Sequence, residues 1–289
     1  MKSVYVVLAF HAHEPLWDFP GQLQALADRE EIRQGIVSEN YLRKRQAEGR
    51  DIYLNLLAMG QRMQAPLCLE ASNELFFQIQ EIIPETFNRL KEGFQNGGLH
   101  PILGHAHHTH VSLLHEAEIV DELRLNAEYF TEIMQLELPE VIGAFPTEDS
   151  IDYHKLEAYE KAGVRYLIFP HLDPAKCRYR LLDREKKPWT GGQKAFTYQP
   201  FSLGHQLLAL PRNFPISQYI WNPITQMRPE PLRAQGYLLG DYPVFAEEYQ
   251  GAEKVPFPIT REEAVEEYTA ILREEVEKAP DNGLLLYIQ

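Results

Sequence analysis

Seven short apolar runs, separated for the most part by helical patterns, predict an α/β fold: a (β/α)7-type barrel that need not close completely. The runs cover residues 4–10, 66–69, 99–103, 141–145, 165–169, 206–210 and 284–288. Short continuous apolar runs are typical of strands that are covered on both faces. Alternating strands and helices indicate parallel strands with right-handed crossovers. We therefore expect one barrel domain over residues 1–289, with a doubly wound open sheet as the alternative.

Four segments have the apolar spacing of amphipathic helices. They cover residues 84–96, 116–134, 151–162 and 260–278. Pro84 suits a first helical turn, and Gly97 with Gly98 suits the end of that helix. Thr260 and Glu263 have the spacing of a capping box, which predicts the start of the last helix.

Three long stretches interrupt the alternation. They cover residues 17–60, which are expected to be partly helical, 170–200 and 212–258. Long loops in a compact domain are usually functional. In a barrel they would surround a site at the C-terminal ends of the strands.

Charge and composition exclude several classes of partner. The chain has 42 acidic and 28 basic residues, a net charge of -14, which argues against nucleic acid and anionic membranes because both bind clustered Lys and Arg. The acidic surface also has the simpler meaning of solubility. No run approaches the roughly 18 apolar residues of a membrane helix. The two cysteines, Cys68 and Cys177, form no Cys-x-x-Cys pair, which fits a cytoplasmic protein.

Polar residues follow the predicted strands, where barrels of this type carry their chemistry. The candidates are His11, His13 and Glu14 after the first run, His105, His107, His108 and His110 after the third, Glu148 and Asp149 after the fourth, His171 and Asp173 after the fifth, and Arg212 after the sixth. A single histidine is most often structural, but several at successive strand ends predict one site. We expect His11, His13, the segment 105–110 and Glu148 to line one pocket.

The His-x-His pair at residues 11 and 13 has two interpretations. In metal-dependent barrel hydrolases such a pair supplies imidazole ligands to zinc or a similar ion. In a saccharide site the imidazoles bind hydroxyl groups instead. Spacing alone does not decide between them.

Glu148 is the candidate nucleophile. A carboxylate that attacks an anomeric carbon must be held rigidly, and a second carboxylic acid must protonate the leaving oxygen. The alternative is that Glu148 and Asp149 cap the helix that follows, since Asp149-Ser150 resembles a helix start.

These residues resemble glycoside hydrolase family 57, part of the glycoside hydrolase/deacetylase superfamily. His-Ala-His-Glu-Pro at residues 11–15 is similar to the family's His-x-His-Gln-Pro, with Glu14 in place of Gln. Residues 104–114 are similar to its histidine-containing segment. Gly-Ala-Phe-Pro-Thr-Glu at residues 143–148 resembles its Gly-x-Trp-Leu-Pro-Glu, with the Trp replaced by Phe and the Pro displaced. Arg212 and Trp221 resemble its sugar-binding wall.

The resemblance implies a retaining glycoside hydrolase or transglycosylase that acts on α-glucan or a related saccharide, without metal or cofactor. Glu148 would form the glycosyl-enzyme. The implied substrate-binding residues are His11, His13, Glu14, His105, His107, His108, His110, Arg212 and Trp221. Trp221 would stack on sugar faces.

The general acid departs from the family pattern. The family's acid is an Asp shortly after a late strand, and residues 284–289 resemble that strand. We therefore expect the acid and the family's C-terminal helices outside residues 1–289, and little glycosidase activity from these residues alone. Asp173 and Asp241 are the substitutes within them. A metal-dependent barrel hydrolase such as a polysaccharide deacetylase, with His11 and His13 as ligands, and a non-catalytic saccharide-binding relative are the alternative functions.

Overall fold

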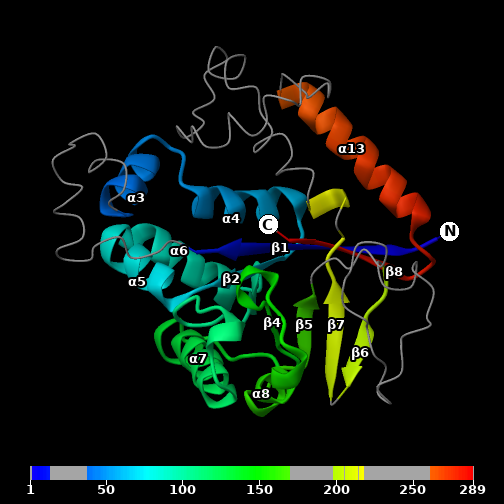
Figure 1. Cartoon of the computed structure of the whole chain (residues 1–289). Helices are drawn as coiled ribbons and strands as arrows, with labels where there is room; N and C mark the ends of the chain where they lie inside the picture. The colour runs from blue at the N-terminus through cyan, green and yellow to red at the C-terminus, as the bar shows by residue number, and fades with distance from the viewer. Residues whose placement is uncertain are drawn as a thin grey trace, which may run out of the picture.

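A computed structural model describes residues 2–13, 38–169, 198–204, 206–213, 215–217 and 261–288 (Figure 1). Its strands form two four-stranded sheets, with the orders β3-β2-β1-β8 and β4-β5-β7-β6. The strands are β1 (Val4–Ala12), β2 (Leu67–Ala71), β3 (Leu99–Ile102), β4 (Gly143–Ala144), β5 (Tyr166–Phe169), β6 (Phe201–Gly204), β7 (Leu207–Pro211) and β8 (Gly283–Ile288). No helix in the described part of the chain is long and apolar enough to cross a membrane.

The two sheets are joined at two places by isolated parallel bridges. Leu103 bridges to Ala144 beyond β3, and Arg212 bridges to Leu286 beyond β7. The first seam has two backbone hydrogen bonds of 2.9 Å, one on each side of Leu103. All seven predicted strands are present and parallel, and they follow one another around an incompletely closed barrel. The predicted fold class is confirmed.

One strand was not predicted. β6 pairs antiparallel with β7, with a register irregularity between Ser202 and Gly204. Because only two residues separate β6 from β7, the pair can only form a hairpin. β6 therefore adds an edge to the second sheet without entering the ring of parallel strands.

Helices lie between the strands, and most follow the predicted segments. They are α3 (Ser38–Ala47), α4 (Ile52–Met63), α5 (Asn73–Ile82), α6 (Pro84–Gln95), α7 (Glu116–Glu128), α8 (Leu156–Lys161) and α13 (Arg261–Lys278). Pro84 occupies the first turn of α6, and Gly97 after its end has a φ of +77°. α7 continues into a π-helical turn, η2 (Tyr129–Ile133). Thr260, from the predicted capping box, lies outside the described residues.

α5 is a helix that the sequence analysis missed. It starts directly after β2, at Ser72, whose hydroxyl accepts a hydrogen bond from the Leu75 amide. Its buried residues, which include Phe76 and Ile79, pack in the largest apolar cluster. Ser72 therefore ends β2 and begins α5 with no intervening loop.

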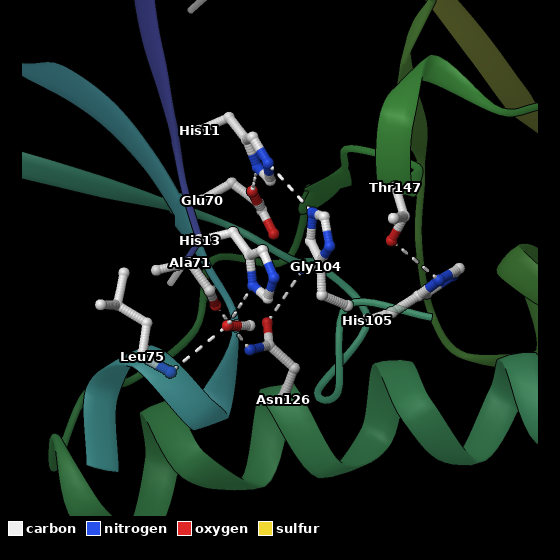
Figure 2. A network of polar contacts seen from close by, with 11 residues as sticks. His11, His13, Glu70, Ala71, Leu75, Gly104, His105, Asn126 and Thr147 are labelled. Atoms are coloured by element: carbon white, nitrogen blue, oxygen red, sulfur yellow. Dashed lines mark hydrogen bonds and ion pairs between the residues drawn. The ribbon is translucent and has the colours of Figure 1, made fainter. Parts of the chain in front are cut away.

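Asn126 on α7 ties the ends of two strands together (Figure 2). Its buried amide donates to the Ala71 carbonyl at 3.0 Å and accepts from the Gly104 amide at 3.0 Å. A further hydrogen bond of 2.8 Å joins it to the side chain of Asn73. Asn126 thereby fixes β2 relative to the segment after β3, at the end of the barrel where the candidate histidines lie.

We expect Asn126→Ala to lower the free energy of unfolding by about 2–4 kcal/mol, because a buried polar group left without a partner costs about 1–3 kcal/mol. The Ala71 carbonyl and the Gly104 amide both lose their partner. Urea denaturation measures the effect. Asn55→Ala, the same change at an exposed position of α4, is the control and should cost much less. Equal losses in the two variants would contradict this role of Asn126.

Candidate active site

His11 and Glu70 form the buried base of the candidate site. They are direct neighbours in the register of the parallel strands β1 and β2. His11 Nδ1 is hydrogen-bonded to Glu70 Oε2 (Figure 2), and Glu70 is only 1% exposed. A charged group with so little access to water requires a partner, and His11 is the partner that the neighbouring strand provides.

The pKa of His11 is raised above its ordinary value. Burial alone would lower this pKa, but the charge and hydrogen bond of Glu70, together with the charges of Glu148 and Asp149, outweigh burial. The charges of Glu148 and Asp149 therefore act on the same imidazole as Glu70, from the opposite side of the barrel seam.

His13 and His108 form a stacked pair above this base. Their ring centroids are 3.6 Å apart with an interplanar angle of 8°. His108 Nε2 lies 3.1 Å from His11 Nε2, and His13 Nδ1 lies 3.3 Å from the Ser72 hydroxyl. Burial and the neighbouring imidazoles lower the pKa of His13 to about 4 and that of His108 to about 3. Two neutral imidazoles thus stand next to one that favours a positive charge.

His105 lies deeper and links the segment after β3 to the segment after β4. It is 1% exposed, and its Nδ1 lies 2.6 Å from the Thr109 carbonyl and 3.3 Å from the Thr147 hydroxyl. Its Nε2 is 3.4 Å from the Tyr159 hydroxyl. Burial lowers the pKa of His105. These contacts indicate that His105 positions the segment next to Glu148.

Glu148 stands in a strained backbone conformation. It lies in the 3-10 turn η3 (Thr147–Asp149), and both Glu148 and Asp149 have positive φ angles, 56° and 55°. Non-glycine residues rarely adopt this conformation, which is enriched at functional sites. The next helical turn, η4 (Tyr153–Lys155), is capped by the side chain of Asp152.

Arg212, at the end of β7, holds the residue that follows Glu148. Its Nη1 donates to Asp149 Oδ2 at 2.5 Å. Burial raises the pKa of Asp149, and Arg212 opposes that rise. The ion pair joins the end of β7 to the segment after β4.

The remaining predicted residues lie further out or outside the described part of the chain. His107 is bonded to Glu122 on α7 at 2.8 Å, and His110 lies 2.8 Å from the Ser112 hydroxyl. Glu14, His171, Asp173, Trp221 and Asp241 are outside the described residues. Among the described residues, no three or more His, Cys, Asp or Glu side chains are placed to hold a metal ion.

Glu70 is the residue that the sequence analysis missed. Its signal was a single acidic residue directly after the apolar run 66–69, in the strand sequence Leu-Cys-Leu-Glu-Ala. Charged residues are rarely buried without a partner. An acidic residue in a strand that is covered on both faces therefore indicates a buried ion pair.

The arrangement is that of a barrel with its polar cluster at the C-terminal ends of the strands, as in barrel enzymes. The family model of Glycosyl hydrolase family 57 matches residues 7–221. The chain belongs to this family. No curated protein sequence matches it.

Solved structures with the same fold are distant in sequence. The 4-alpha-glucanotransferase of Thermococcus litoralis is 12% identical with a TM-score of 0.51, over 100% of this chain and 40% of that one. A protein named as a polysaccharide deacetylase, from Mycobacterium smegmatis, is 12% identical with a TM-score of 0.56, over 99% and 76%. A GH57-type branching enzyme from Pyrococcus horikoshii is 11% identical with a TM-score of 0.52, over 100% and 63%. The chain thus spans less than half the length of the glucanotransferase, and these likenesses show the fold.

We expect Arg212→Gln to destabilise the protein more at pH 7 than near pH 4. At pH 7 Asp149 is ionised and loses a hydrogen bond to a charged partner, which is worth about 1.5–3 kcal/mol. Loss of Arg212 raises the pKa of Asp149 further, so the deficit shrinks as pH falls through that pKa and disappears once Asp149 is protonated in both proteins. The ordinary pKa of an aspartate is 3.8 and that of Asp149 is raised, so the deficit should shrink within a pH range above 3.8.

Urea denaturation of the wild type and of Arg212→Gln across this pH range measures the difference in their free energies of unfolding. The contributions of titratable groups that behave alike in both proteins cancel in this difference. Lys161→Gln is the control, since its partners Glu116 and Glu157 are exposed and its loss should cost little at any pH. A deficit for Arg212→Gln that stayed constant between pH 7 and pH 4 would contradict the assignment to Asp149.

Proposed function

We propose that this protein is a retaining glycoside hydrolase or transglycosylase that acts on α-glucan, with Glu148 as its nucleophile. The observation that carries the proposal is the position of Glu148, in a strained turn at the end of β4 with its charge acting on His11. Membership of Glycosyl hydrolase family 57 supports this reaction class. The glucanotransferase and the branching enzyme that share the fold support α-glucan as the substrate.

In the proposed reaction, the Glu148 carboxylate attacks the anomeric carbon as the glycosidic bond breaks. A second carboxylic acid gives its proton to the leaving oxygen, and a glycosyl–Glu148 ester forms. The second acid, now a carboxylate, then takes a proton from water or from an acceptor sugar hydroxyl. The oxygen that loses this proton attacks the ester and releases Glu148. Water yields hydrolysis, and a sugar acceptor yields transfer.

The charge pattern suits these steps. The nucleophile of a retaining enzyme must be an ionised carboxylate, and the charge of Glu148 contributes to the raised pKa of His11. His13 and His108, which favour their neutral forms, would each offer one ring nitrogen as a donor or acceptor to sugar hydroxyls. Glu14, His105, His107, His110, Arg212 and Trp221 remain proposed substrate-binding residues.

The metal-dependent alternative would use the imidazoles differently. A ligating histidine offers one unprotonated ring nitrogen to the metal and commonly donates its other ring N–H to a carboxylate, as His11 does to Glu70. Metal content measured in protein purified without chelators separates the two functions. Stoichiometric zinc or manganese that is lost in a His11→Ala variant would favour the deacetylase-type reaction.

We expect Glu148→Gln to lower kcat by at least about 10³-fold, equivalent to about 4 kcal/mol of transition-state stabilisation, with little change in saccharide binding. The amide keeps the shape of the side chain and removes the nucleophile. The assay uses the full-length protein and a nitrophenyl α-maltooligosaccharide, whose leaving group needs no proton. Binding is measured separately by calorimetry with maltooligosaccharide.

Glu92→Gln is the matched control, because Glu92 is exposed on α6 and paired with Arg89. It should turn over at the wild-type rate. Wild-type turnover in Glu148→Gln would exclude Glu148 as the nucleophile. Saccharide binding without turnover in the wild type would instead favour a non-catalytic relative.

A further inference from the structure

The side chain of Glu70, in β2, lies between β1 and the segment after β3. Glu70 is opposite His11 of β1, and its carboxylate reaches the position of Gly104 beyond β3. A Cβ atom on residue 104 would lie 1.8 Å from Glu70 Oε1 and 2.8 Å from its carboxyl carbon. Only glycine therefore fits at residue 104 while Glu70 stays where it is.

The glycine is itself held in place. Its amide donates to Asn126, whose amide also binds the carbonyl of Ala71, the residue next to Glu70 (Figure 2). The carboxylate thus lies between β1 and the segment after β3, which Asn126 of α7 holds in place. This placement fixes the direction in which Glu70 receives its hydrogen bond from His11.

We propose that Glu70 is a positioning residue of the active site: through His11 it fixes the ring orientation and tautomer of His108, so that His108 presents an Nδ1–H donor to the sugar. The proposal rests on the proposed function, since it assigns a role within the same saccharide site. Glu70 would act through His11 and would not itself contact the substrate.

The proton positions follow from the contacts. Glu70 accepts at Nδ1 of His11, which therefore carries a proton there. In the protonated imidazole Nε2 also carries a proton, and it donates to His108 Nε2 at 3.1 Å. A neutral imidazole has one acceptor nitrogen and one N–H. Since His108 accepts at Nε2, its proton must lie on Nδ1.

The titratable groups that face His11 come from four elements. Glu70 faces it from β2, Glu148 and Asp149 from η3, and His13 and His108 from β1 and the segment after β3. Arg212 lies behind Asp149 and neutralises part of its effect. If Glu70 loses its charge, the burial that lowers the pKa of His11 is opposed only by Glu148 and Asp149. His11 would then lose its proton at a lower pH, and the tautomer of His108 would no longer be fixed.

The test is a pH titration of the histidine ring nitrogens by ¹⁵N NMR in wild type and Glu70→Gln. In the wild type His11 should titrate above 6.5, its ordinary value, and His108 should carry its proton on Nδ1. In Glu70→Gln, which keeps the side-chain shape, His11 should titrate at a lower pH than in the wild type and the Nδ1 tautomer of His108 should lose its dominance. Glu122→Gln is the control: it should alter His107 and leave His11 unchanged.

Gly104→Ala gives a second route to the same change, because its Cβ displaces the carboxylate without removing it. It should lower the pKa of His11 as Glu70→Gln does. In both variants kcat/KM should fall at least about tenfold at neutral pH, as is usual when a residue that orients an imidazole is lost, and should recover partly at lower pH as His11 is protonated again. Purely structural damage would not recover.

The proposal is overturned if His11 titrates at the same pH in wild type and Glu70→Gln, or if His108 carries its proton on Nε2 in the wild type. These NMR results do not depend on turnover. A wild-type protein without glycosidase activity would overturn the proposed function, while the titrations would still decide what Glu70 does to His11 and His108.

Discussion

The ion pair between Glu70 and His11 is the interaction on which the candidate site depends. A carboxylate that is 1% exposed cannot remain ionised without a charged or strongly hydrogen-bonding partner, and the register of β1 and β2 places His11 directly opposite. The pair explains the glycine at residue 104, whose missing side chain leaves room for the carboxylate. In the role that we propose for Glu70, it also makes His11 the donor in its contact with His108.

The rest of the site is assembled by side-chain contacts between strand ends. β3 meets β4 through a single bridge, and so does β7 with β8. His105 reaches Thr147 across the seam between β3 and β4, and Arg212 reaches Asp149 between the ends of β7 and β4 in the second sheet. Such bonds compensate for the short sheet pairing of β4, and they hold Glu148 in a backbone conformation that it would not adopt by itself.

Sequence reasoning predicted the seven parallel strands because each is an apolar run bounded by polar residues, and this signal is local. It missed β6 and α5, since the first is an edge strand and the second starts at the residue after β2. It identified His11, His13 and His108 only as members of a group. Which of them stack, and which stands opposite Glu70, depends on strand register and on the positive φ of His108, and neither can be derived from residue spacing.

The central claim, that Glu148 forms a covalent intermediate within the histidine cluster, is tested most directly by trapping that intermediate. A 5-fluoro-α-glucosyl fluoride carries an activated leaving group and slows the breakdown of the glycosyl–enzyme, so the ester accumulates. Peptide mapping by mass spectrometry should find one fluoroglucosyl adduct, on the peptide that contains Glu148, and none in the Glu148→Gln variant. An adduct on any other carboxylate, Asp149 included, or an unlabelled but active protein would contradict the account.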